Sequence, residues 1–247
     1  GLEGIAVSNG EDVVLSSRDG AWVLPVRANT EFVFVVKPPR YEVSVNPWMV
    51  PQHYFHVDPS DGPQEEKKLD FALTPAQKQD VFKVIVFGDP QARGLREVNF
   101  ITHDVVEECM GLDADFGISL GDIVADDPAL FEPISASIAQ IGIPWYNVFG
   151  NHDNDRGAIN DEDSDDTYER FFGPSTYAFE HGEVSFIVYK NIYFDTGGKY
   201  RPHFTRKQIQ FTKNYLGKIP EDKLIVLLMH APVVACDNRE KLFDLLE

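Results

Sequence analysis

The sequence predicts a small β-sandwich over residues 1–77, followed by a layered α/β domain over residues 81–247. Two observations lead to this prediction. The first part contains short runs rich in valine and aromatic residues, with turn signals between them, which is typical of antiparallel strands. In the second part, continuous apolar runs alternate with stretches of helical period, which indicates strands covered by helices on both faces.

The strands predicted for the first part are short and separated by turn-forming pairs. They cover residues 5–8, 13–16, 21–26, 31–36 and 69–73. The pairs are Asn9-Gly10, Asp19-Gly20 and Pro38-Pro39, which commonly form turns. A proline-rich loop, residues 46–64, contains His53 and His56. We expect both histidines to be solvated rather than bound to metal.

The second part alternates strand-like and helical runs. The predicted strands cover residues 81–87, 115–120, 144–149, 184–189 and 224–229. The predicted helices cover residues 96–110, 129–141 and 204–216. We expect the acidic run over residues 161–166 to be a solvated loop, as such runs usually are.

Composition narrows the possible partners. The chain carries 22 Lys and Arg against 40 Asp and Glu, a net charge of −18. Such a chain repels nucleic-acid phosphates and anionic lipid, so neither is expected as a bulk partner. No apolar run reaches the roughly 18 residues that indicate a membrane span. The two cysteines exclude a disulfide framework and a zinc site of four thiolates.

Four of the predicted strands are followed by polar side chains that can bind metals. They are Asp89, Asp122, Asn151 and His230, and a glycine directly precedes the first three. A glycine lets the chain turn sharply or approach a ligand closely. Ligands of open α/β sheets bind at the carboxyl ends of the strands, so we expect these side chains at one edge. Carboxylate, amide and imidazole suit Mn, Fe, Zn or Co. The competing interpretation is turn-forming Asp and Asn plus one buried histidine.

The ordered motifs carry a family resemblance. GDPQ (88–91), GDIVADD (121–127), GNHD (150–153) and MH (229–230) resemble the motifs of calcineurin-like metallophosphoesterases over residues 81–247. The resemblance implies hydrolysis of a small phosphorylated substrate. It also implies a dinuclear site of two divalent ions, Mn, Fe or Zn, and a metal-bound hydroxide that attacks phosphorus.

The resemblance also implies a role for each site residue. Asp89 binds the first metal and Asp122 bridges both metals, whereas Asn151 and His230 bind the second. His152 is catalytic and does not bind metal. It donates a proton to the leaving oxygen or stabilises the phosphate, a role that suits histidine because the ordinary pKa of an imidazole lies near neutrality.

A nearby acid is expected to orient that histidine. Asp126 lies four residues after Asp122, and we take it as the candidate.

Gln91 departs from the family pattern, which is usually Asp-x-His at the first motif. A glutamine oxygen is neutral and harder than an imidazole nitrogen, so it binds a first-row metal more weakly. We therefore expect a first metal that is weaker, exchangeable or oxygen-preferring, such as Mn or Mg. The alternative is that Gln91 points away and caps the following helix.

A second departure lies at the end of the chain. The family completes its metal site with Gly-His-x-His after the lone histidine, and no such motif occurs before Glu247. A helical pattern also begins at Arg239 without a stop signal. We therefore expect a catalytic domain that is truncated before its last motif, with one ligand fewer for each metal.

The first part of the chain has a looser resemblance. GIAVSNGEDVVLSSRDGAWVLPV, residues 4–26, resembles the carboxypeptidase-regulatory, transthyretin-like modules. Such modules often precede catalytic domains of secreted bacterial proteins, which implies a periplasmic or extracellular location.

The sequence leaves two functions open. One is a metal-dependent phosphoesterase, and the other is a catalytically degenerate phosphoesterase fold that acts as a secreted binding or scaffold protein.

Overall fold

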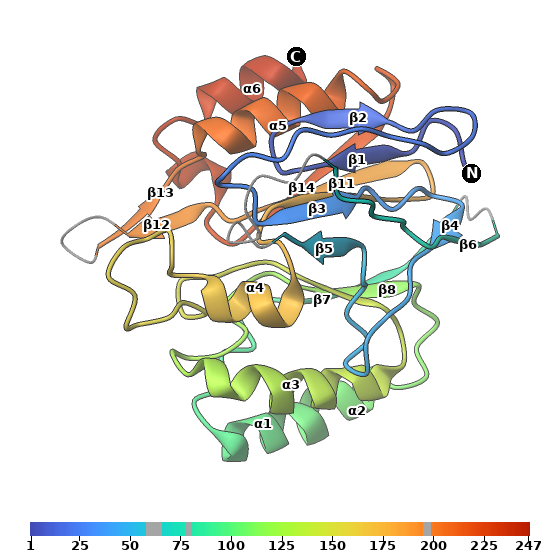
Figure 1. Cartoon of the computed structure of the whole chain (residues 1–247). Coiled ribbons are helices and arrows are strands. Elements are labelled where there is room, and N and C mark those ends of the chain that lie inside the picture. The colour runs from blue at the N-terminus through green and yellow to red at the C-terminus, as the bar shows by residue number, and fades with distance from the viewer. Residues whose placement is uncertain (58–65, 78–80, 195–198) are drawn as a thin grey trace.

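The computed structural model describes residues 1–57, 66–77, 81–194 and 199–247. The strands of its amino-terminal part are β1 (Ala6–Ser8), β2 (Val13–Leu15), β3 (Phe32–Val35), β4 (Tyr41–Glu42), β5 (Tyr54–His56) and β6 (Thr74–Pro75). One antiparallel sheet has the order β2-β1-β3-β5, and β4 pairs separately with β6. The predicted strand-rich character of this part is confirmed (Figure 1).

Two of the strands predicted for this part are wrong. Residues 21–26 and 69–73 pair with no strand in the structure. Their apolar side chains, such as Trp22 and Phe71, instead pack as irregular segments against one face of the sheet. The sequence alternation reflects this burial rather than a ladder of backbone hydrogen bonds, and Pro25 lacks the N–H that a ladder needs.

His53 also differs from the prediction. Its ring is buried beside the rings of Phe34, Tyr54 and Tyr177, whereas His56 is exposed as expected. Complete burial disfavours the charged imidazolium and lowers the pKa of His53 to about 4, although a bond to a backbone carbonyl opposes the shift. Residues 58–64 of the predicted loop lie outside the described residues.

The second part contains two three-stranded sheets. The strands are β7 (Val84–Phe87), β8 (Phe116–Ser119), β9 (Trp145–Asn147), β10 (Tyr177–His181), β11 (Val184–Tyr189), β12 (Ile192–Phe194), β13 (Tyr200–Pro202) and β14 (Leu224–Met229). The first sheet has the parallel order β7-β8-β9. The second has the order β10-β11-β14, in which β11 and β14 are parallel. The pair β12–β13 forms a separate antiparallel ladder.

Helices cover the outer faces of these sheets. They are α1 (Leu95–Ile101), α2 (Glu107–Cys109), α3 (Phe131–Ile138), α4 (Asp166–Phe172), α5 (Arg206–Leu216) and α6 (Glu240–Leu246). A π-helical segment, Thr102–Val106, joins α1 to α2. Short 3-10 turns cover Pro128–Leu130, Ala139–Ile141 and Val233–Ala235. Figure 1 shows α1, α2 and α3 on one side of the molecule and α5 and α6 on the other.

The main core lies between the two sheets. Side chains alternate along β11, so that Phe186 meets Phe116 of β8 at 5.5 Å between ring centroids. Ser185 and Tyr189 point to the opposite face and hydrogen-bond to side chains of α5. This arrangement confirms the predicted layered α/β fold. The prediction that strands are buried on both faces holds for β8. It does not hold for the edge strand β7, in which Val86 is 52% exposed.

The amino-terminal sheet shares this core. The ring of Phe34 in β3 lies 5.7 Å from that of Phe211 in α5. Further along the chain, Lys37 forms a parallel bridge with Phe179 of β10. The side chain of Asn214 in α5 also donates a hydrogen bond to the carbonyl of Glu11, at 2.8 Å. The segments on either side of residue 77 are therefore joined by packing and by backbone pairing.

The acidic run is not simply a solvated loop, contrary to the prediction. Asp165 is 6% exposed and precedes α4 directly. Its carboxylate lies 2.7 Å from the buried ammonium group of Lys190. A buried cation needs such a partner, so this contact anchors the acidic segment on the end of β11. Among the described residues, no helix has both the length and the apolar character to cross a membrane.

Candidate metal centre

The polar residues that follow four strands converge at one place, but from two sheets. Asp89, Asp122 and Asn151 follow β7, β8 and β9 of the first sheet. His230 follows β14, which belongs to the second sheet. The expectation of a single sheet edge is therefore wrong. The site lies where the carboxyl ends of both sheets meet.

Two glycines permit this approach. A Cβ on Gly121, whose φ is +90°, would lie 2.6 Å from Nδ1 of His230. A Cβ on Gly150 would lie 2.1 Å from the backbone nitrogen of Asp122. At both positions the glycine lets two protein segments approach closely, whereas the expected approach to a ligand stays a prediction. At Gly88 an added Cβ meets nothing within 4 Å, so close packing does not explain the first glycine.

The backbone of the site is strained. Left-handed φ angles occur at Asp89 (47°), Gln91 (46°), Asp122 (49°) and Asp126 (70°), and among the other described non-glycine residues only at Met49. This conformation costs a non-glycine residue roughly 1–2 kcal/mol. Such strain persists only where surrounding contacts hold it, and it gathers at functional sites.

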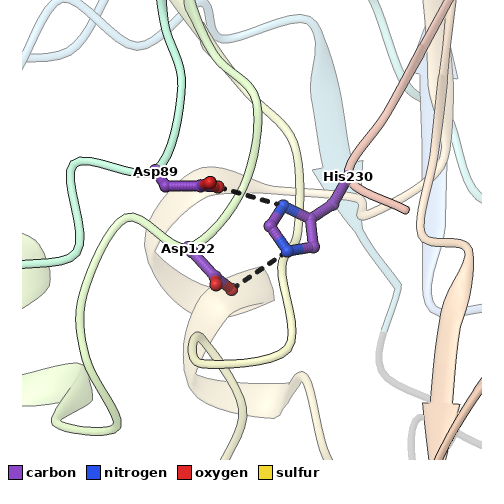
Figure 2. A group of neighbouring side chains, drawn as sticks. All are labelled: Asp89, Asp122 and His230. Atoms are coloured by element: carbon purple, nitrogen blue, oxygen red, sulfur yellow. Dashed lines mark ion pairs between the residues drawn. The ribbon is translucent and has the colours of Figure 1, made fainter. Parts of the chain in front are cut away.

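His230 lies between two carboxylates, as Figure 2 shows. Its Nδ1 is 3.5 Å from Asp89 and its Nε2 is 3.4 Å from Asp122. Nδ1 also lies 2.9 Å from the carbonyl oxygen of Leu120. A carbonyl only accepts, so Nδ1 carries a hydrogen, and Nε2 is the ring nitrogen that could bind a metal. The amide oxygen of Asn151 lies 3.2 Å from this Nε2.

The donor set fits a divalent cation. Three ligand atoms lie within 4.8 Å of one another, one each from Asp89, Asp122 and His230. These atoms repel one another unless a cation or a proton lies between them. Burial disfavours the imidazolium, but the contacts with Asp122 and Leu120 outweigh it and raise the pKa of His230 to about 9. Carboxylate and imidazole ligands of this kind suit Mn, Fe or Zn.

Gln91 faces the site rather than the following helix. Its side-chain nitrogen lies 3.4 Å from Oδ2 of Asp122, and its backbone N–H donates to the Asp122 carbonyl at 2.8 Å. The first residue before α1 is Gly94, and no side chain caps that helix. The alternative that Gln91 caps the helix is therefore wrong.

His152 is bonded to the cluster through its backbone, and its ring contacts an acid outside the cluster. Its backbone N–H donates to Oδ1 of Asp122 at 2.9 Å. Its ring Nδ1 lies 2.7 Å from Oδ1 of Asp126, which is the orienting acid that the sequence suggested. Burial raises the pKa of Asp126, but hydrogen bonds from Arg156 and His152 outweigh that effect and leave the pKa below its ordinary value.

Two residues of the site had no role in the sequence analysis. The buried carboxylate of Asp153 accepts backbone hydrogen bonds from Ile123, Val124 and Gly150, which ties the loop after β8 to the loop after β9. Burial raises the pKa of Asp153 to about 8, although these donors oppose the shift. Asp153 is the last residue of the GNHD motif, so the motif could have indicated it. Nothing in the sequence distinguishes Arg156, whose guanidinium contacts Asp126.

Comparison with known families agrees with this geometry. A family model described as Calcineurin-like phosphoesterase matches residues 82–245. The chain belongs to this family, as its motifs predicted. A second model, described as N terminal of Calcineurin-like phosphoesterase, matches residues 1–76. No curated protein matches the chain. The family hydrolyses phosphoesters with divalent metals, whereas the likeness to transthyretin-like modules stays a prediction.

Proposed function

We propose that this protein hydrolyses a phosphate ester at a dinuclear metal site. Asp89 and Gln91 hold the first ion, Asn151 and His230 hold the second, and Asp122 bridges both. The observation that carries the proposal is the position of Asp122. Its Oδ2 accepts a hydrogen bond from the side-chain nitrogen of Gln91 at 3.4 Å, and its Oδ1 lies 3.4 Å from Nε2 of His230. One carboxylate thus presents an oxygen to each group of ligands.

Divalent ions bound by these residues would neutralise charge on phosphoryl oxygens and would supply a hydroxide near neutral pH. As the new P–O bond forms, the bond to the leaving oxygen breaks. That oxygen takes its proton from His152. Because Nδ1 of His152 faces Asp126, at 2.7 Å, Nε2 is the atom that remains for the leaving oxygen.

The two halves of the site differ in access to solvent. The Asp89 side chain is 59% exposed, whereas that of His230 is 13% exposed. The exposure of Asp89 and the lack of charge on Gln91 both weaken metal binding at the first position. We therefore propose that the first ion exchanges readily and prefers oxygen ligands, and that the second ion is held more tightly.

The proposal is tested by turnover with added Mn²⁺. The probes are p-nitrophenyl phosphate and bis(p-nitrophenyl) phosphate, which separate monoester from diester activity. His152→Ala should lower kcat by roughly 10²–10⁴-fold, since that is the usual contribution of a general acid. His103→Ala is the control, because this exposed histidine contacts only Glu107 in the described structure.

Turnover unaffected by His152→Ala would contradict the proposed mechanism. Stoichiometric Mn²⁺ binding without turnover of either ester would support the alternative role, in which a catalytically degenerate phosphoesterase fold acts as a secreted binding or scaffold protein. A periplasmic or extracellular location is proposed for either role.

A further inference from the structure

We propose that Arg156 is a positioning residue that holds the Asp126 carboxylate where it aligns His152, an inference that rests on the proposed function. Arg156 lies outside the four motifs and binds none of the candidate metal ligands in the described structure. It contacts only the far side of the acid that orients the catalytic histidine. Three side chains thus form a chain that leads from the surface into the site.

The two oxygens of Asp126 have different partners. Oδ1 lies 2.7 Å from Nδ1 of His152, and Oδ2 is bound by Nη2 of Arg156. The backbone N–H of Asp126 also donates to the carbonyl of His152, at 3.0 Å. With one partner on each oxygen, the carboxylate cannot rotate without breaking a charge-assisted hydrogen bond. Arg156 therefore sets the direction of the oxygen that His152 meets.

Arg156 is the most exposed of these three side chains. The side chain of Asp126 is 22% exposed, that of His152 is 30% exposed and that of Arg156 is 63% exposed. Exposed ion pairs add little to folding stability. Removing the Arg156 guanidinium should therefore leave the fold intact and loosen only the Asp126 carboxylate. The Asp126 side chain has a partner on each oxygen, and its backbone adopts a left-handed φ of 70°.

The competing role for Arg156 is direct contact with the substrate phosphate. The two roles differ in their kinetics. A residue that acts through His152 changes protonation of the leaving oxygen, so its loss harms poor leaving groups more than good ones. A residue that binds phosphate affects all esters equally and changes KM.

The experiment compares phenyl phosphate, a poor leaving group, with p-nitrophenyl phosphate, a good one, in the Mn²⁺-loaded protein. Arg156→Ala should lower kcat for phenyl phosphate about tenfold, the low end of the effect of an orienting group, and lower it less for p-nitrophenyl phosphate. KM should stay within about twofold. Arg156→Lys should retain part of the rate, because lysine keeps the charge but not the planar fork.

Two further variants complete the design. In an Asp126→Asn background, Arg156→Ala should have no additional effect, because Arg156 acts only through Asp126. Arg170→Ala is the matched control, since this exposed arginine bonds to Thr167 on α4. Additive losses in the double variant, or a raised KM with unchanged kcat for both esters, would overturn the inference.

A second readout separates this inference from the proposed function. Nitrogen NMR of the His152 ring in the metal-free protein should show hydrogen on Nδ1, since the Asp126 carboxylate only accepts. Arg156→Ala should shift the Nδ1 signal, and Arg170→Ala should not. If the wild-type protein hydrolyses no ester but this shift occurs, the proposed function fails and the positioning role stands. An unchanged signal in Arg156→Ala overturns the positioning role.

Discussion

Gly150 leaves the space that Asp122 occupies. A Cβ at position 150 would lie 2.1 Å from the backbone nitrogen of Asp122 and 2.4 Å from its Oδ1. The glycine that follows β9 and the acid that follows β8 are therefore in direct contact. The proposed bridging carboxylate can occupy this position because residue 150, on the neighbouring loop, has no side chain.

Replacing Gly150 with alanine should damage both the fold and the site. Overpacking of this kind costs about 1–3 kcal/mol, and the overlap is with backbone rather than with a flexible side chain. We expect loss of Mn²⁺ binding and a free energy of unfolding lower by at least about 2 kcal/mol in urea titration. Gly157→Ala is the control, because an added Cβ there meets nothing within 4 Å. Equal behaviour of the two variants would contradict this explanation.

Asp122→Asn should remove bound metal. The change preserves size but replaces a bridging carboxylate by a neutral amide, which is a weaker ligand for two cations. We expect stoichiometric Mn²⁺ in the wild-type protein, measured by elemental analysis after desalting, and less than about a tenth of it in the variant. Asp113→Asn serves as the control, since that side chain is 97% exposed. Metal retained in Asp122→Asn would exclude this carboxylate as a ligand.

Gln91→His should strengthen the first metal position. The Gln91 side chain already faces Asp122, and imidazole is a better ligand than an amide for Zn²⁺. We expect calorimetric titration with Zn²⁺ to show the weaker of two binding events tightening about tenfold, with the tighter event unchanged. A change in the tighter event alone would show that Gln91 belongs to the other ion.

Burial of His53 should make stability depend on pH. The folded pKa is about 4, below the ordinary value of about 6.5. Between these values the unfolded chain binds a proton that the folded chain does not. The stabilisation is therefore complete above pH 6.5 and is lost as the pH falls towards 4. Between pH 7 and pH 5 the loss is about 2 kcal/mol.

His53→Leu should remove this part of the pH dependence. The measurement is the free energy of unfolding in urea at pH 7 and pH 5, compared with the wild-type protein. His56→Leu is the control, because the His56 side chain is exposed. If the wild-type protein and His53→Leu lose the same stability over this range, His53 titrates normally in the folded state.

Local patterns in the sequence predicted the second part of the chain well. The helix predicted over 204–216 is α5, Arg206–Leu216, and its start is set by reciprocal hydrogen bonds between Thr205 and Gln208. The strand predicted over 184–189 is β11. Such elements follow from periodicity and capping, which depend only on neighbours in the chain.

The strands of the first part were harder to predict. Residues 69–73 alternate like a strand but pair with none, because an irregular segment that packs on a sheet buries its side chains with the same period. Periodicity reports which side chains are buried. It does not report whether the backbone has a partner strand.

Local sequence specifies which ligand types follow the strands of this protein, because Asp89, Asp122, Asn151 and His230 each follow an apolar run. Long-range packing instead brings His230 to the others from a second sheet and places Arg156 against Asp126. The burial of His53 was decided in the same way. Each of these depends on which faces pack together, a contact between residues far apart in sequence that no local pattern encodes.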